Sequence, residues 1–143
     1  MATIDRGRIG MIGMTLAERI FLLRRARAFA RLYDRELGSI ALACKVRQYV
    51  AGEVVGRAGR PLRYLHLVAD GRVLDGASGA LPAVFGATSL LTGQSLENDL
   101  LADAEKGAAC LLLSRPHFLT LVNEYPPLLV NLLNEWREER SRE

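Results

Sequence analysis

Glycine residues divide the middle of this 143-residue sequence into short segments. From Val46 onward, runs rich in Val, Leu and Tyr alternate with glycines at positions 52, 56, 59, 71, 76, 79, 86 and 93. Such spacing is typical of short strands joined by tight turns, because glycine adopts the positive φ angles that many turns require. The pattern predicts a small barrel or sandwich over residues 45–113, within a mainly β protein of the α+β class.

Helical patterns flank this β region on both sides. Thr15 and Glu18 have the spacing of a capping box, and the apolar residues that follow predict helices over 15–44. Ser114 can begin a further helix and another follows Pro127, which predicts two C-terminal helices over 115–140. Residues 1–14 carry three glycines and no clear period. We therefore expect a flexible leader followed by one domain over 15–143.

The dipeptide Asp70-Gly71 predicts a chain reversal inside the β region. It separates two apolar segments, residues 64–68 and residues 72–74. Asp-Gly between two strands is a strong signal for a two-residue hairpin turn. We therefore expect these two segments to pair with each other, and we expect residues 75–80 to form a loop.

Three segments of the β region resemble the cyclic nucleotide-binding domain family. The first has the pattern R-x-Y-x-x-G-E over residues 47–53, the second is a strand-like segment that ends at Gly71, and the third reads F-G-x-x-x-L-L over residues 85–91. The resemblance covers about residues 20–133. It implies a jelly roll, or double-stranded β-helix, with helices at both ends and a regulatory role in signalling.

The resemblance also implies a ligand site, and here the sequence departs from the family pattern. Ala87 stands where the family has the Glu that binds the ribose, and Leu96 or Glu97 stands where it has the Arg that binds the phosphate. No Arg occurs from Thr92 to Glu105. The residues implied for this altered site are Phe85, Gly86, Ala87, Thr88, Ser89, Leu96 and Glu97.

These departures weaken the prediction of a bound cyclic nucleotide. Loss of one partner of a buried charge pair costs about 2–5 kcal/mol. The hydroxyls of Thr88 and Ser89 could still donate to a ligand, and the sequence leaves open whether an Arg from the barrel replaces the missing one. The candidates for that role are Arg60, Arg63 and Arg72. We expect no cofactor, with cyclic AMP or cyclic GMP bound in the usual way disfavoured.

No other group of residues predicts catalysis or metal binding. His66, His117, Cys44 and Cys110 are isolated in the sequence and lack metal-ligand spacing. Ser114 and His117 could suggest a nucleophile pair, but their position favours helix capping, since residues three apart at a helix start rarely aim at one carbonyl. We expect a non-catalytic protein with no metal and with buried, reduced cysteines.

The last predicted helix carries the strongest candidate for a partner surface. Its apolar stripe comprises Leu129, Leu132, Leu133 and Trp136. Such a stripe on a terminal helix either packs on its own domain or pairs with another chain, and the family often pairs chains through the equivalent helix. Both alternatives remain open: a homodimer or protein partner through this helix, and packing against the barrel.

Charge is distributed unequally along the chain, although the formal total is only +3. Residues 1–72 hold 14 Lys and Arg against 6 acids, and residues 73–143 hold 5 against 10. The basic half could attract an anionic partner, or the two halves could neutralise each other. The candidate contacts on the first helices are Arg24, Arg25, Arg27 and Arg31. The sequence ends soon after the last helix, so a helix-turn-helix and sequence-specific DNA binding are not expected.

The remaining features concern location and the choice between two functions. No apolar run reaches the length of a membrane span and no signal peptide opens the sequence, which predicts a cytoplasmic protein, and the excess of Arg over Lys is typical of bacteria with GC-rich genomes. The leading hypothesis is a regulatory or protein-interaction module with a degenerate phosphate-binding cassette. The alternative is a small-molecule sensor. An open cavity over residues 86–89 would favour the sensor, and a cavity filled by Phe85, Leu90 or Leu96 would favour the module.

Overall fold

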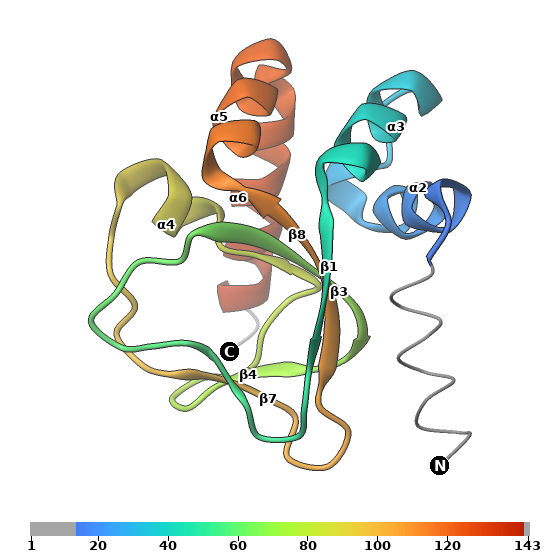
Figure 1. Cartoon of the computed structure of the whole chain (residues 1–143). Helices are drawn as coiled ribbons and strands as arrows, with labels where there is room; N and C mark the ends of the chain where they lie inside the picture. The colour runs from blue at the N-terminus through green and yellow to red at the C-terminus, as the bar shows by residue number, and fades with distance from the viewer. Residues whose placement is uncertain (1–13, 142–143) are drawn as a thin grey trace.

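The computed structural model describes the backbone of residues 14–141 and the side chains of residues 14–133. Within that part, helices lie above a β region and enclose it on one side (Figure 1). The flexible leader predicted at residues 1–14 falls almost entirely outside the described residues. The elements are α2 (Leu16–Arg25), the 3₁₀ helix η1 (Arg27–Phe29), α3 (Asp34–Ala43), β1 (Lys45–Tyr49), β2 (Val54–Gly56), β3 (Tyr64–Gly71), β4 (Val73–Asp75), β5 (Gly79–Ala80), β6 (Val84–Phe85), α4 (Ala87–Thr92), β7 (Leu100–Ala102), β8 (Ala108–Ser114), α5 (Arg115–Glu124) and α6 (Pro126–Ser141).

The described strands form two four-stranded sheets. One has the order β1-β8-β3-β6 and the other the order β2-β7-β4-β5. Every paired neighbour in both sheets is antiparallel. Strands that are distant in sequence lie side by side, such as β1 with β8, as a jelly roll requires. The mainly β fold with helices at both ends is therefore confirmed.

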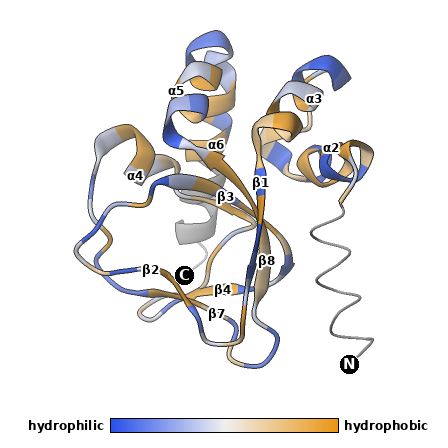
Figure 2. Ribbon diagram, in the orientation of Figure 1, coloured by the Kyte–Doolittle hydropathy of each residue, from blue (hydrophilic) through white to orange (hydrophobic). Residues whose placement is uncertain are grey.

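Strand β8 is buried on both of its faces and separates two hydrophobic cores. Leu111 and Leu113 belong to the core beneath the helices, together with residues of α2, α3, α5 and α6. Cys110 and Leu112 point the other way, into the core between the two sheets. This alternation follows from the two-residue period of a strand. It explains why β8 is apolar from Ala108 to Leu113 (Figure 2).

The predicted hairpin at Asp70-Gly71 is wrong. Strands β3 and β4 lie on either side of this dipeptide, yet β3 belongs to the first sheet and β4 to the second. Gly71 has a φ of 75° and a Cβ there would lie 2.2 Å from the carbonyl oxygen of Gly107. The positive φ thus carries the chain from one sheet to the other. The hairpin lies one turn later, where β4 pairs with β5 through Asp75↔Gly79, inside the segment predicted as a loop.

The N-terminal helices α2 and α3 contact each other and pack on the first sheet. The predicted capping box is present: the amide of Glu18 donates to the Thr15 hydroxyl, and the Glu18 carboxylate accepts from the amide of Thr15. The helix ends at Arg25 and a 3₁₀ turn follows, so the stretch 15–44 is broken into three pieces. The Arg19 guanidinium donates to the carbonyls of Ala41 and Cys44, which ties α2 to α3.

Helix α6 lies at the centre of the helical layer. It packs against η1, α5 and α4. It therefore connects the N-terminal helices to α5 and to the short helix α4 of the β region (Figure 1). Leu128 is fully buried at its start, with 2% of its surface exposed. Among the described residues no helix is both long and apolar enough to cross a membrane.

Candidate functional site

A cavity of about 510 Å³ lies between α4, the β4–β5 hairpin and the segment that leads into β7. Its volume falls within the range of about 300–1,000 Å³ that is typical of small-molecule sites. The seven residues implied for the altered ligand site all line it. Leu132 and Leu133 of α6 border it as well. The space over Gly86–Ser89 is thus open rather than filled by the side chains of Phe85, Leu90 or Leu96.

Helix α4 forms one wall of the cavity, and its start is fixed by Gly86. This glycine has a φ of 108°, and a Cβ there would lie 2.9 Å from the carbonyl oxygen of Tyr64. Leu90 anchors the other side of the helix in the core with 0% of its surface exposed. The Arg115 guanidinium donates to the Leu90 carbonyl at 2.8 Å. Backbone geometry and packing together therefore hold α4 against the cavity.

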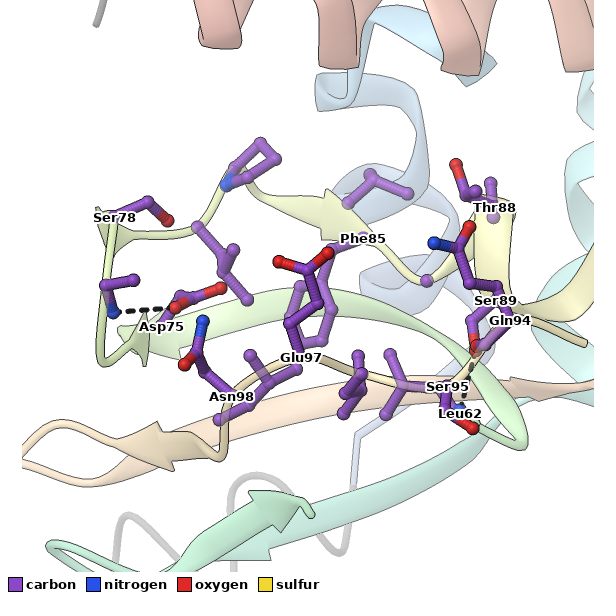
Figure 3. Close-up of a pocket in the computed structure, with 18 of the residues that line it drawn as sticks. Leu62, Asp75, Ser78, Phe85, Thr88, Ser89, Gln94, Ser95, Glu97 and Asn98 are labelled. Carbon is purple, nitrogen blue, oxygen red and sulfur yellow. Dashed lines mark hydrogen bonds between the residues drawn. The ribbon is translucent and has the colours of Figure 1, made fainter. Parts of the chain in front are cut away.

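Ser89 lines the cavity but its hydroxyl is engaged by the protein itself. The hydroxyl donates to the carbonyl oxygen of Gln94 and accepts from the amide of Leu62, both at 2.8 Å. The prediction that Ser89 could donate to a ligand is therefore wrong in this structure, because its hydrogen is already used to close the α4–β7 loop. Thr88 lies beside the cavity without such bonds from its side chain (Figure 3).

The opposite wall is apolar at Leu96 and acidic at Glu97. Leu96 packs so closely on the β2 region that a Cβ on Gly56 would lie 2.7 Å from its Cδ1 atom. The carboxylate of Glu97 instead points into the cavity (Figure 3). It has no hydrogen-bond or ion-pair partner among the described residues. This side of the cavity thus presents a packed leucine beside a carboxylate that has no partner among residues 14–133.

Negative charge is the only formal charge that the described residues bring to this cavity. Asp75 and Glu97 line it, and no Lys, Arg or His of residues 14–133 does so. Asp75 uses one oxygen to accept from the amide of Ala77 at 2.8 Å, which closes the β4–β5 turn. The other oxygen has no such bond. The electrostatics of this lining oppose an anionic ligand.

None of the three barrel arginines proposed as substitutes, Arg60, Arg63 and Arg72, lines the cavity. The Arg72 guanidinium makes two bonds to the same carboxylate oxygen of Asp103, at 2.7 and 3.0 Å. Backbone amides of Lys106 and Glu105, followed by Arg72, lower the pKa of Asp103 to about 2. Arg60 is exposed outside the cavity, and Arg63 borders a separate shallow groove beside α5.

Phe85 lines the cavity, and an aromatic stack lies behind it. The Phe85 ring lies on the His66 ring with centroids 4.7 Å apart and planes 13° apart. The His66 Nε2 atom lies 3.2 Å from the Tyr49 hydroxyl, and Nδ1 lies 3.0 Å from the carbonyl oxygen of Tyr64. Burial lowers the pKa of His66 to about 4. Neutral His66 therefore donates from Nδ1 and accepts from Tyr49, which makes it a satisfied core residue rather than a metal ligand.

Comparison with known proteins decides the fold. No protein-family model matches this sequence, and no curated protein matches it either. The chain is similar in structure to the regulatory subunit of a cAMP-independent protein kinase A from Trypanosoma brucei, with a TM-score of 0.69, 16% identity, and coverage of 89% of this chain and 47% of that one. It is also similar to the catabolite activator protein of Thermus thermophilus, with a TM-score of 0.65, 23% identity, and coverage of 82% and 59%.

The sensor domain of the transcriptional regulator DNR from Pseudomonas aeruginosa gives a TM-score of 0.66 at 16% identity, with 87% of this chain and 89% of that one covered. The chain has the cyclic nucleotide-binding fold. It spans about half the length of the first structures it matches, at 47% and 53%.

Ser114 and His117 were considered above as a nucleophile pair, and their position favoured helix capping instead. The Ser114 hydroxyl and His117 Nδ1 lie 2.8 Å apart at the start of α5. No carboxylate of the described residues is hydrogen-bonded to His117, and both residues lie outside the cavity. The pair joins the first turn of the helix. The described residues also contain no cluster of His, Cys, Asp and Glu suited to a metal ion.

The predicted stripe on α6 is divided by the fold. Leu132 is buried with 5% of its surface exposed, and it packs in the core beneath the helices. Leu129 and Leu133 are half-buried, and the side chain of Trp136 lies outside the described residues. Sequence reasoning missed Leu128, which the helical period of the stripe would have included. Leu132 is therefore covered by its own chain rather than free for a partner.

Proposed function

We propose that this chain is a non-catalytic regulatory domain that binds a small molecule in its cavity, and that this molecule is not a cyclic nucleotide held in the usual way. One observation carries the proposal: the cavity over Gly86–Ser89 is open, and its described lining offers two carboxylates and no cation. An open cavity of ligand size favours a sensor over a filled, purely structural remnant.

Electrostatics argue against a cyclic phosphate in this cavity. A carboxylate about 4 Å from a phosphate oxygen repels it by about 1 kcal/mol in bulk water and by about 4 kcal/mol at the effective dielectric near a protein surface. Glu97 is exposed, so the lower figure is the nearer one. The absent Arg adds a loss of about 2–5 kcal/mol. The Trypanosoma brucei regulatory subunit with this fold is described as part of a cAMP-independent kinase, so the fold does not oblige a protein to respond to cyclic AMP.

A protein-interaction role, with α6 joining two chains or holding a partner, is the second candidate. Val130 of α6 is 55% exposed, which leaves an apolar position on this helix uncovered. Burial of Leu132 removes one of the four residues first assigned to the interface. The interaction candidate therefore depends on a narrower face than the sequence implied, and we rank it below the sensor.

Thermal unfolding with added ligands tests the sensor proposal. Cyclic AMP and cyclic GMP at millimolar concentration should leave the melting temperature unchanged. At least one member of a set of uncharged and cationic fragments should raise it by several degrees, because a ligand at about 100 times its Kd stabilises a domain by about 2.7 kcal/mol.

The variant Thr88→Phe provides the matched control, because a ring at this position projects into the cavity without replacing a core residue. A stabilisation that persists in Thr88→Phe comes from another site. Stabilisation by a cyclic nucleotide that the variant abolishes would contradict the proposal, and absence of any stabilising fragment would favour the interaction role.

A further inference from the structure

We propose that the cavity selects organic cations, with an amine or guanidine group of the ligand paired to the carboxylate of Glu97. The inference rests on the proposed function, because it assigns the ligand class of the same cavity. The inference assigns the sign of the ligand's charge and the residue that binds it. Glu97 lies on the β7 side of the cavity, where the resemblance implies an Arg.

The first support is that Glu97 has no partner of its own. Its carboxylate points into the cavity, and neither an ion pair nor a hydrogen bond to it is present among the described residues (Figure 3). The exposed acid two residues further along is already used, because Asp99 accepts from the amide of Ala58 at 2.8 Å. Glu97 is thus an anion that no side chain of residues 14–133 compensates, and it is directed at an open space.

The second support is that a second acid reinforces this charge. Asp75 lines the same cavity from the β4–β5 hairpin, and only one of its oxygens is bound, by the amide of Ala77. A ligand cation in the cavity would be attracted by both carboxylates. A negative ligand would be repelled by them. The charge of the lining therefore discriminates between ligands by sign.

The third support is that the surface next to Glu97 is apolar and held in place. Leu96 and Leu62 both pack closely on Gly56. A Cβ on Gly56 would lie 2.7 Å from Leu96 Cδ1 and 2.9 Å from Leu62 Cδ2. Phe85 is fixed by its stack on His66. An apolar ligand body can lie on this surface while its cationic end reaches Glu97. The expected ligand is amphipathic, with one cationic end.

Three probes that share a phenylethyl body test the inference: 2-phenylethylamine, 2-phenylethanol and 3-phenylpropionate. Each is titrated into the full chain while amide and side-chain NMR shifts of the cavity residues are followed. The ammonium probe should bind about five-fold more tightly than the alcohol, which is the range of a partly exposed ion pair, and the carboxylate should bind most weakly.

Two charge-neutralising variants make the test specific. Glu97→Gln should reduce the affinity for the amine to that for the alcohol. Glu105→Gln removes the same charge from an exposed position outside the cavity and should leave the preference intact. Raised salt should narrow the difference between amine and alcohol in the wild type, because exposed charges are screened.

The outcomes separate this inference from the proposed function. Equal binding of amine and alcohol at the cavity, tightest binding of the carboxylate, or an amine preference that survives Glu97→Gln would overturn the cation assignment while the sensor proposal stands. Failure of all three probes and of the wider fragment set to shift cavity signals would overturn both. An amine preference lost in Glu97→Gln and kept in Glu105→Gln supports both.

Discussion

At one end of the β-sandwich, Gly71 and Gly107 bring backbone against backbone, while at the other end α4 and the segment before β7 stand apart around a cavity. A Cβ on Gly107 would lie 2.3 Å from the carbonyl oxygen of Tyr49, and one on Gly71 would lie 2.2 Å from that of Gly107. At the cavity end, Gly86 is similarly enclosed, but Gly93 has nothing within 4 Å of a Cβ. Close backbone contacts of Gly71 and Gly107 hold the first end, which we call the turn end. Side chains line most of the other end, which we call the cavity end.

This difference shows which contacts hold each end of the sandwich. The turn end depends on glycines and on Asp103, whose carboxylate accepts from the amides of Glu105 and Lys106 and from Arg72. None of these contacts involves a ligand. At the cavity end, the exposed Glu97 has no hydrogen-bond or ion-pair partner among residues 14–133, so its chemistry can change while the strands keep their paths.

The largest expected effect is at the turn end, from Gly107→Ala. A positive φ of 70° and a Cβ only 2.3 Å from a backbone oxygen should together cost about 3–5 kcal/mol of folding free energy. The matched control is Gly79→Ala, where φ is 86° but nothing lies within 4 Å, so only about 1–2 kcal/mol is expected. Urea denaturation measures both, and equal costs would show that the close approach is not what fixes this end.

The next effect concerns the aromatic stack behind the cavity. Burial lowers the pKa of His66 from 6.5 to about 4, so between these values the unfolded chain binds a proton that the native protein does not. Stability is therefore fully present above pH 6.5 and is lost as the pH falls through about 4, by up to about 3 kcal/mol.

Urea denaturation between pH 7.5 and about 4 checks this, with a buffer series at constant ionic strength. His66→Phe should flatten the pH dependence in this window, and the exposed His117→Gln should keep the slope. A slope that survives in His66→Phe would assign the pH dependence to other groups.

The smallest expected effect compares two neighbouring residues of α4, Ser89 and Thr88, which both line the cavity. Ser89→Ala leaves the Leu62 amide and the Gln94 carbonyl without their partner and should cost about 1–3 kcal/mol. The neighbouring Thr88→Ala should change stability by no more than about 0.5 kcal/mol, because its hydroxyl makes no such bonds. If both variants are equally stable, the α4 wall is held by Leu90 and Arg115 alone.

Local patterns in the sequence predicted a helix cap and the short strands of the β region. The Thr15–Glu18 capping box formed as predicted, and the glycine-punctuated region became short antiparallel strands. The altered cassette stays a prediction from the resemblance, although the residues implied for it do line one cavity. The cap and strand predictions succeed because each depends on residues a few positions apart.

Only the tertiary structure decided which strands pair and where side chains point. Asp70-Gly71 has the local signal of a hairpin, yet the approach of Gly107 makes it a crossing between sheets. The Ser89 hydroxyl donates to the Gln94 carbonyl and accepts from the amide of Leu62, which lies 27 residues away in sequence. Leu132 is covered by the core, and Glu97 is left facing an open space. Each outcome depends on contacts between distant segments, and no local pattern encodes those.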